Sequence, residues 1–244
     1  MWFTFVLLQL LPQLTLSAHC PSGCVCDIRG SAKCTGDITD IPPLNPTTTF
    51  LLQLNDTNIK VLKDRSFQPK LNYLNLADNQ LRNLLKTLFH NLRQLKSLVL
   101  SSNQLETLES GSFDHLSNLL VLMLQKNQIR EIPPRLFCLF CCLPKLKKLS
   151  LKNNDLGELD PELFSNLISV QILMLNENKL ESLPSAIFRN TSSLEILDLN
   201  HNHLRHLPGD GSTDMHFSGP MPHCFLGHWC SPDCGQLIYV VSAS

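Results

Sequence analysis

Six asparagines recur at a nearly constant spacing along this chain, and no other feature constrains its fold as strongly. They are Asn79, Asn103, Asn127, Asn154, Asn178 and Asn202, so the successive intervals are 24, 24, 27, 24 and 24 residues. Each lies in the frame Leu-x-x-Leu-x-Leu-x-x-Asn-x-(Leu/Ile) or a close variant of it, as in the segment 71–81. Self-similarity at such a fixed period indicates a solenoid of stacked units. A solenoid presents a broad surface and rarely carries catalysis of its own.

The frame predicts an α/β solenoid in which each repeat contributes one short strand, for example Tyr73 to Leu76. The leucines of the strand alternate inward, because successive strand side chains point to opposite faces. Stacked strands then form a curved parallel sheet on a concave face, and the chain returns along an irregular or short helical convex side. The asparagine follows the strand, where we expect its buried amide to satisfy backbone groups of the next turn.

A second column consists of phenylalanines, which we expect to form an aromatic spine under the convex side. Its members are Phe67, Phe89, Phe113, Phe164 and Phe188. The first repeat is degenerate, because Thr57 stands where an asparagine is expected, and terminal repeats are often atypical. We interpret the residues of both columns as structural and not as functional.

The chain is expected to divide into four segments. Residues 1–18 read as a signal peptide and residues 19–45 as a cysteine-rich amino-terminal cap. Residues 46–208 hold about seven repeats, of which the last is incomplete, and residues 209–244 form an irregular tail that contains cysteine and histidine.

The beginning of the chain indicates export. Met1 to Ala18 contains no charged side chain and includes the apolar run Phe3 to Leu11, which is typical of a secretory signal peptide. No later run reaches the roughly 18 apolar residues that a membrane span needs. The formal net charge of −1 gives no reason to expect attraction to nucleic acid. We therefore predict a secreted, extracellular protein.

Cysteine usage and glycosylation signals agree with that compartment. Cys20, Cys24, Cys26 and Cys34 follow the signal directly, and a cluster of this kind in an exported chain indicates disulfides. A zinc site with similar spacing is the alternative, which an oxidising compartment disfavours. Asn55 and Asn190 each open an Asn-x-Ser/Thr sequence and are predicted glycosylation sites.

The run from Cys20 and Pro21 to Cys34, followed by Ile41-Pro42-Pro43, resembles the amino-terminal cap of extracellular leucine-rich repeat proteins. In that family the first cysteine pairs with the third and the second with the fourth. The resemblance therefore implies the disulfides Cys20–Cys26 and Cys24–Cys34. The repeats extend it to about residue 208, and it implies a protein-binding solenoid without cofactor or metal, similar to secreted plasma members of the family.

The chain departs from the family pattern in its tail and in one repeat. The tail lacks the family's Asn-Pro-Trp-x-Cys-x-Cys cap, which an alternative transcript or an imperfect gene model would explain. An uncapped end is expected to expose apolar core. The segment 137–143 carries three extra residues and lies on the convex side by the frame. The pairing of the remaining cysteines stays open: Cys138, Cys141, Cys142, Cys224, Cys230 and Cys234.

The tail also raises the alternative of metal binding, which we weigh against a disordered segment. The side chains concerned are His216, His223, Cys224, His228, Cys230 and Cys234. We favour the disordered segment and predict no metal site.

The predicted ligand-binding surface consists of strand positions that flank the inward leucines. Its residues are Tyr73, Asn75, Val99, Val121, Met123, Lys148, Ile172, Met174, Ile196 and Asp198. Six of them are apolar, and clusters of exposed apolar side chains often mark protein-binding sites. The alternative is that these residues are ordinary strand formers, chosen for β propensity.

Three functions are compatible with this surface, and catalysis is not among them. The first is a secreted glycoprotein that binds a growth factor, receptor or foreign antigen. The second is a non-catalytic carrier subunit of an extracellular enzyme, and the third is the truncated ectodomain of a membrane receptor. His201, His203 and His206 cluster but have no paired nucleophile in the frame, so we predict that the chain is not an enzyme. The ligand and the oligomeric state remain open.

Overall fold

The computed structural model describes residues 20–132, 140 and 142–205. The predicted signal peptide and the tail at 209–244, with its cysteines and histidines, lie outside these residues. The described chain forms one sheet in which the strands follow one another in sequence order. The strands are β1 (Cys24–Cys26), β2 (Ser31–Cys34), β3 (Leu51–Gln53), β4 (Tyr73–Asn75), β5 (Ser97–Val99), β6 (Val121–Met123), β7 (Lys148–Ser150), β8 (Ile172–Met174) and β9 (Ile196–Asp198).

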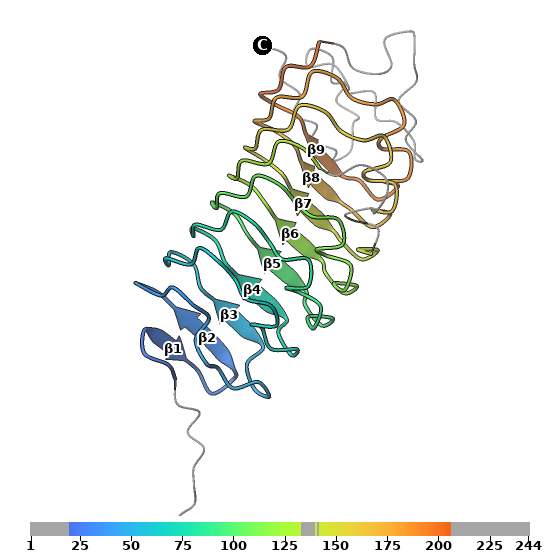
Figure 1. The fold of residues 1–244 in the computed structure, drawn as a ribbon. Coiled ribbons are helices and arrows are strands. Elements are labelled where there is room, and N and C mark those ends of the chain that lie inside the picture. Colours follow the sequence, from blue (N-terminus) through green and yellow to red (C-terminus); the bar gives the residue numbers. More distant parts are fainter. Residues whose placement is uncertain (1–19, 133–139, 141, 206–244) are drawn as a thin grey trace, which may run out of the picture.

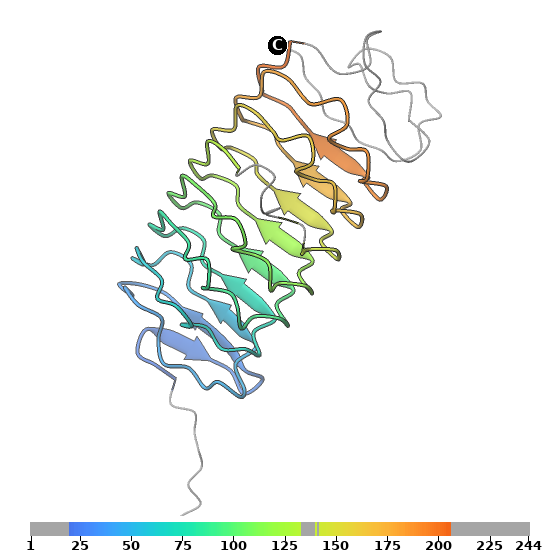
Figure 2. The same ribbon diagram turned by 45° about the vertical axis from the view of Figure 1, so that its right-hand side comes forward.

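The strands from β2 onward are parallel and stack in register, which confirms the predicted solenoid. Figures 1 and 2 show them side by side along one face of the stack, with the chain returning on the other. In each of β3 to β9 the central leucine is buried. The register aligns these leucines, as in Leu98 on β5 opposite Leu122 on β6. The return segments of the described residues are turns and irregular chain without a helix, which is one of the two forms expected for the convex side.

A ladder of buried asparagine amides holds consecutive repeats together. The Nδ2 group of Asn127 donates to the carbonyls of Leu124 and Gln125 in its own repeat at 3.0 and 3.4 Å. It also donates to Leu100 O in the preceding repeat at 3.0 Å, while its Oδ1 accepts from Leu105 N at 3.1 Å. Asn103, Asn154, Asn178 and Asn202 make equivalent contacts. One amide thus serves four backbone groups where the strand ladder ends.

The direction of this ladder corrects the expectation from the sequence. The amides bond to their own turn and to the preceding repeat, not to the next one. In the preceding repeat, one backbone carbonyl and one backbone N–H have no strand partner beyond the end of the sheet ladder, as with Leu100 O and Leu105 N. The asparagine amide forms hydrogen bonds with both groups. In the first repeat the hydroxyl of Thr57 takes over part of this role, donating to Leu54 O and to Asn79 Oδ1.

The phenylalanine spine is continuous and contains one member more than the sequence predicted. The rings of Phe67, Phe89, Phe113, Phe140, Phe164 and Phe188 stack with centroid separations of 6.0 to 6.5 Å. Phe140 is fully buried between Phe113 and Phe164, so it fills the gap that the sequence analysis left. The three extra residues of this repeat therefore precede Phe140, because the spacing from Phe140 to Leu143 equals that from Phe113 to Leu116.

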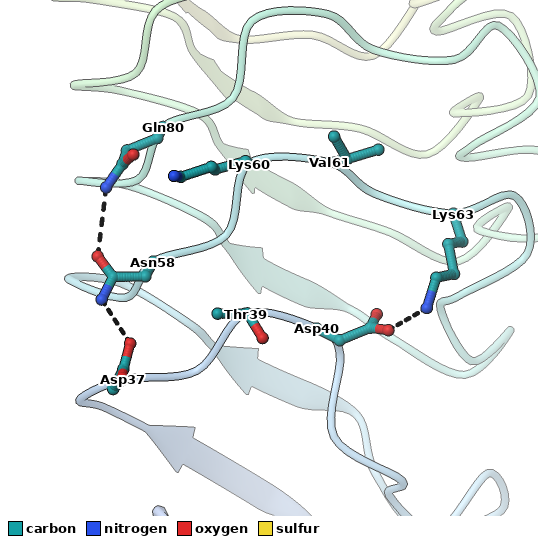
Figure 3. A pocket seen from close by; sticks show the side chains of 8 residues that line it. All are labelled: Asp37, Thr39, Asp40, Asn58, Lys60, Val61, Lys63 and Gln80. Atoms are coloured by element: carbon teal, nitrogen blue, oxygen red, sulfur yellow. Dashed lines mark hydrogen bonds and ion pairs between the residues drawn. The ribbon is translucent and has the colours of Figure 1, made fainter.

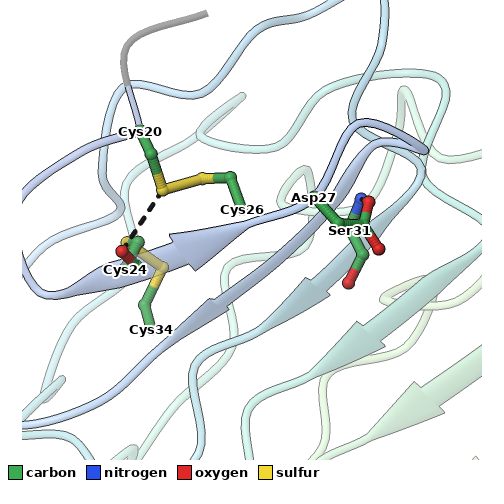
Figure 4. Close-up of a disulfide and its surroundings, with 6 residues drawn as sticks. All are labelled: Cys20, Cys24, Cys26, Asp27, Ser31 and Cys34. Atoms are coloured by element: carbon green, nitrogen blue, oxygen red, sulfur yellow. Dashed lines mark hydrogen bonds between the residues drawn. A yellow bond between two sulfur atoms is a disulfide. The ribbon is translucent and has the colours of Figure 1, made fainter.

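The amino-terminal end of the sheet is a disulfide-bonded hairpin (Figure 4). Disulfides join Cys20 to Cys26 and Cys24 to Cys34, the pairing that the family resemblance implied. β1 pairs with β2 antiparallel, and Asp27 Oδ1 accepts from Ser31 N in the connecting turn at 2.8 Å.

Gly30 ends this turn at a φ of +91°, and a Cβ there would lie 1.9 Å from Thr48 O. Only glycine fits this position, where the hairpin meets the chain that leads into β3.

Candidate ligand-binding surface

The structure brings the ten predicted surface residues onto one face of the parallel sheet. They occupy the first and third positions of β4 to β9, on either side of the buried leucine. All ten are half-buried, as expected for side chains that stand upright beside one another on an uncovered sheet. Ser150, which occupies the third position of β7, is only 3% exposed. We call this surface the concave face.

The strand register places the apolar side chains in two groups. Val121 and Met123 on β6 lie beside Val99 on β5. On the far side, Ile172 and Met174 on β8 adjoin β9, where Ile172 aligns with Ile196. β7 separates the two groups with Lys148 and Ser150. The concave face is therefore an apolar surface with one cationic side chain near its middle.

The strands end in a row of left-handed residues that the sequence analysis did not predict. Each precedes a ladder asparagine or its Thr57 substitute, and their φ angles lie between +52° and +58°: Asp56, Asp78, Ser102, Lys126, Asn153, Glu177 and His201. Their N–H groups continue the sheet, as Lys126 N donates to Lys152 O at 3.0 Å. Among residues other than glycine, Asp and Asn tolerate this conformation best, and their presence at three of these seven positions was the available signal.

Polar side chains at these turns form a network along the edge of the concave face. Glu177 accepts a hydrogen bond from Asn153 Nδ2 at 2.8 Å and pairs with Lys152 Nζ at 3.0 Å. The hydrogen bonds from Asn153 and Lys152 lower the pKa of the Glu177 carboxyl below its ordinary value, so it is ionised at neutral pH. On β9 Asp198 accepts from Asn200 N at 3.1 Å.

Two buried acceptors flank this network. Gln125 Oε1 and Asn176 Oδ1 have no hydrogen-bond partner among the described residues. They occupy the same position in the repeats on either side of Lys152. A ligand that covers this edge has to offer donors or leave room for water, because a buried acceptor without a partner is costly.

A second hollow, which the sequence did not predict, lies beside the amino-terminal hairpin (Figure 3). This open pocket has a volume of about 580 Å³, and Figure 3 labels all of its lining residues. Its carboxylates are engaged locally. Asp37 accepts from Asn58 Nδ2 at 2.7 Å, and Asp40 pairs with Lys63. The hydrogen bond from Lys63 lowers the pKa of the Asp40 carboxyl. The pocket is open and internally paired, so we assign it no ligand.

The described part of the chain holds a few further groups of titratable side chains. No set of three or more His, Cys, Asp or Glu side chains converges there in a way that suits a metal ion. The rings of His90 and His115 lie 4.1 Å apart, and burial lowers the pKa of His115. Cys142 is exposed and forms no disulfide within the described residues. No helix in these residues has the length and apolar character to cross a membrane.

The two predicted glycosylation sites lie in different surroundings. Asn55 is half-buried just beyond β3, at the amino-terminal edge of the concave face. Asn190 is exposed on the return segment, and its Nδ2 donates to Ser165 O at 3.0 Å. A glycan on Asn190 would therefore project away from the strands.

The parallel coils, the asparagine ladder and the phenylalanine spine define the chain as a repeat solenoid. Matches to the leucine rich repeat family cover residues 51–105, 93–143, 144–204 and 168–216. The chain belongs to the leucine-rich repeat family. No curated protein matches it significantly.

Solved structures agree on the fold. A leucine-rich repeat protein of Leptospira interrogans is 31% identical, with a TM-score of 0.60. The match covers 66% of this chain and 39% of that protein, so this chain spans well under half of its length. In all, 366 solved chains match, and a fold so widely used does not by itself decide function.

Proposed function

We propose that this protein is a secreted leucine-rich repeat glycoprotein that binds an extracellular protein partner on its concave face. The observation that carries the proposal is the pair of apolar groups on β5–β6 and β8–β9. Apolar side chains that stand clear of a protein's core and are rimmed by polar ones mark interaction surfaces. Met123 and Met174 add side chains that adapt to an incoming surface.

The structure of the repeat supports this assignment in a second way. The central, inward position of each strand from β3 to β9 is occupied by a buried leucine that the stacking requires. The outward positions carry no such requirement, since valine, methionine, lysine, serine, isoleucine and aspartate all occur there. A rigid sheet that holds varied side chains in fixed register suits recognition, because little conformational entropy is lost on binding.

The test places a charge in each apolar group. The variant Met123→Glu with Met174→Glu should secrete normally, because both side chains lie outside the core. The wild-type chain is used to capture a partner from extracellular fluid, and the partner is identified by crosslinking and mass spectrometry. The double variant should no longer capture that partner. The matched control is Leu85→Glu with Ile168→Glu, which charges two apolar residues outside the strands that are 47% and 53% exposed. Unchanged capture by the Met variant, or equal loss in the control, would move the binding site elsewhere.

Secretion and glycosylation are part of this proposal and are tested together. Expression in a secretory cell should release a chain whose mass falls on enzymatic removal of N-linked glycans. Asn55→Gln and Asn190→Gln should each remove one glycan. Retention of an unglycosylated chain inside the cell would contradict the proposed compartment.

The partner's nature separates the proposal from its alternatives. The cap at residues 20–45 and the repeats up to about residue 208 are similar in pattern to those of leucine-rich alpha-2-glycoprotein, which favours a free binding protein. They are also similar in pattern to those of the non-catalytic subunit of carboxypeptidase N, which favours a carrier of an enzyme. A stable stoichiometric complex with an exported hydrolase would select the carrier. A downstream exon that encodes a cap and a membrane span would select a truncated receptor ectodomain.

A further inference from the structure

Charge is distributed unevenly along the concave face and its edges. The repeats of β5, β6 and β7 contribute lysines beside the apolar positions: Lys96, Lys126, Lys147, Lys148 and Lys152. The repeats of β8 and β9 contribute carboxylates in the corresponding places: Glu177, Glu195 and Asp198. The chain as a whole is nearly neutral, so this polarity belongs to the face and not to the bulk composition.

Lys148 is the centre of the basic half. The register places it between Val121 on β6 and Ile172 on β8, and it is half-buried. Its amine has no ion-pair or hydrogen-bond partner within residues 20–132, 140 and 142–205. A half-buried lysine between apolar neighbours generally packs its aliphatic stem along them and keeps its charged end in water. An ammonium group in such surroundings gains most from a carboxylate that arrives together with apolar groups.

Some of the other charged side chains on this face and its edges are paired, and some are not. Lys152 is neutralised by Glu177 within the face, and Glu195 accepts from Gln171 at 2.8 Å. Lys126 and Lys147 are exposed and have no ion-pair partner among the described residues. The uncompensated positive charge therefore gathers around β6 and β7, while Asp198 leaves negative charge on β9.

We propose that the concave face selects a protein segment in which a carboxylate flanked by apolar side chains seats on Lys148. Basic groups of the same segment face Asp198 and Glu195. This inference rests on the proposed function and names the chemistry of the partner. Strands lie about 4.8 Å apart, so the opposite charges of the partner lie about 10 Å apart along the solenoid axis. Electrostatic complementarity of this kind fixes orientation and excludes wrong partners.

A sulfated polysaccharide is the competing ligand, because it also seeks lysines. Two features disfavour it. The lysines stand among apolar side chains that a polyanionic sugar cannot cover, and the carboxylates of β8 and β9 would repel it along the same axis.

The probe is a random short-peptide library displayed on phage and selected on the full-length secreted chain. Phage that also bind the Met123→Glu and Met174→Glu variant are removed. The enriched peptides should contain Asp or Glu beside apolar residues. One such peptide is then synthesised with its carboxylate and with the corresponding amide. The amide form should bind about tenfold more weakly than the acid form. Lys148→Glu should reverse the preference, so that the same peptide with Lys in place of its acid binds better than the original.

Lys70→Glu is the control, because it changes the net charge equally at an exposed residue outside the strands. It should leave both peptides unaffected. Equal binding of acidic, neutral and basic peptides that is still lost in the Met variant would overturn the inference and leave the proposed function standing. Enrichment only of phage that bind the Met variant equally well, so that the removal step leaves none, would contradict both. A selection in which no phage is enriched even before the removal step overturns the inference alone, since partner capture decides the proposed function. Displacement of the peptide by heparin at a lower concentration than by a matched acidic peptide would identify a polyanion site and overturn the inference as well.

Discussion

The two faces of a single strand differ more in burial and in residue type than any two repeats of the molecule do. In β6 the central Leu122 is fully buried, whereas Val121 and Met123 on either side of it are half-buried on the concave face. Leucine recurs at the inward position from β3 to β9 because each coil must fit the coil beside it. The outward positions differ from repeat to repeat. Stacking therefore accounts for the residues of the inner face, and it does not account for those of the outer face, where we propose that a partner binds.

The largest expected effect is on the inner side, at the ring that the sequence analysis missed. Phe140→Ala should lower the free energy of unfolding by about 3 to 5 kcal/mol, because it opens a cavity between two stacked rings. Urea denaturation followed by circular dichroism measures this loss. Phe140→Leu should recover more than half of it. A loss below about 1 kcal/mol would show that the ring does not belong to the core of this repeat.

The asparagine ladder should have a smaller effect than the phenylalanine ring. Asn127→Ala leaves buried backbone groups without partners and should cost roughly 1 to 3 kcal/mol in the same experiment. Asn127→Thr is the matched control, because Thr57 fills the equivalent position in the first repeat with one hydroxyl donor. It should lie between the wild type and the alanine variant. Equal stability of all three would mean that water replaces the amide.

Much of this inner architecture could be predicted from the sequence. A fixed period specifies the strand, the ladder and the spine, since each requires one residue type at one place per coil. Phe140 was missed because Phe137 lies at the usual interval of 24 residues after Phe113, whereas Phe140 lies 27 residues after it. The spacing to Leu143, which matches that of Phe113 to Leu116, was the overlooked signal.

The direction of the amide bonds and the left-handed turns depend on how successive coils lie against each other. The sequence frame does not encode that placement, because it records only which residue recurs and at what interval. The concave face could be located for the same reason that the core could, as its positions alternate with the leucines. Its ligand could not be predicted, because no repeated requirement acts on those residues.

A pair of substitutions in one strand tests the comparison directly. Leu122→Ala should cost about 2 to 5 kcal/mol, as a fully buried leucine does. Met123→Ala, one residue away, should cost less than about 1 kcal/mol, since its side chain already faces solvent. Unfolding of both variants in urea, beside partner capture, separates the roles: the first should lose stability and the second should lose binding. Similar stability losses would place Met123 in the core and weaken the proposed site.

The smallest effect lies on the edge of the concave face. Glu177→Gln should cost only a few tenths of a kcal/mol at pH 7, because the pair with Lys152 is partly exposed to solvent and therefore screened. The folded chain depresses the pKa of this carboxyl, so its contribution is present above the ordinary value of 4.5 and is lost as the pH falls through the lower folded value. Urea unfolding at neutral and strongly acidic pH should therefore show a difference between wild type and variant only at neutral pH. A difference that persists in acid would mean that Glu177 acts through packing at its left-handed turn and not through its charge.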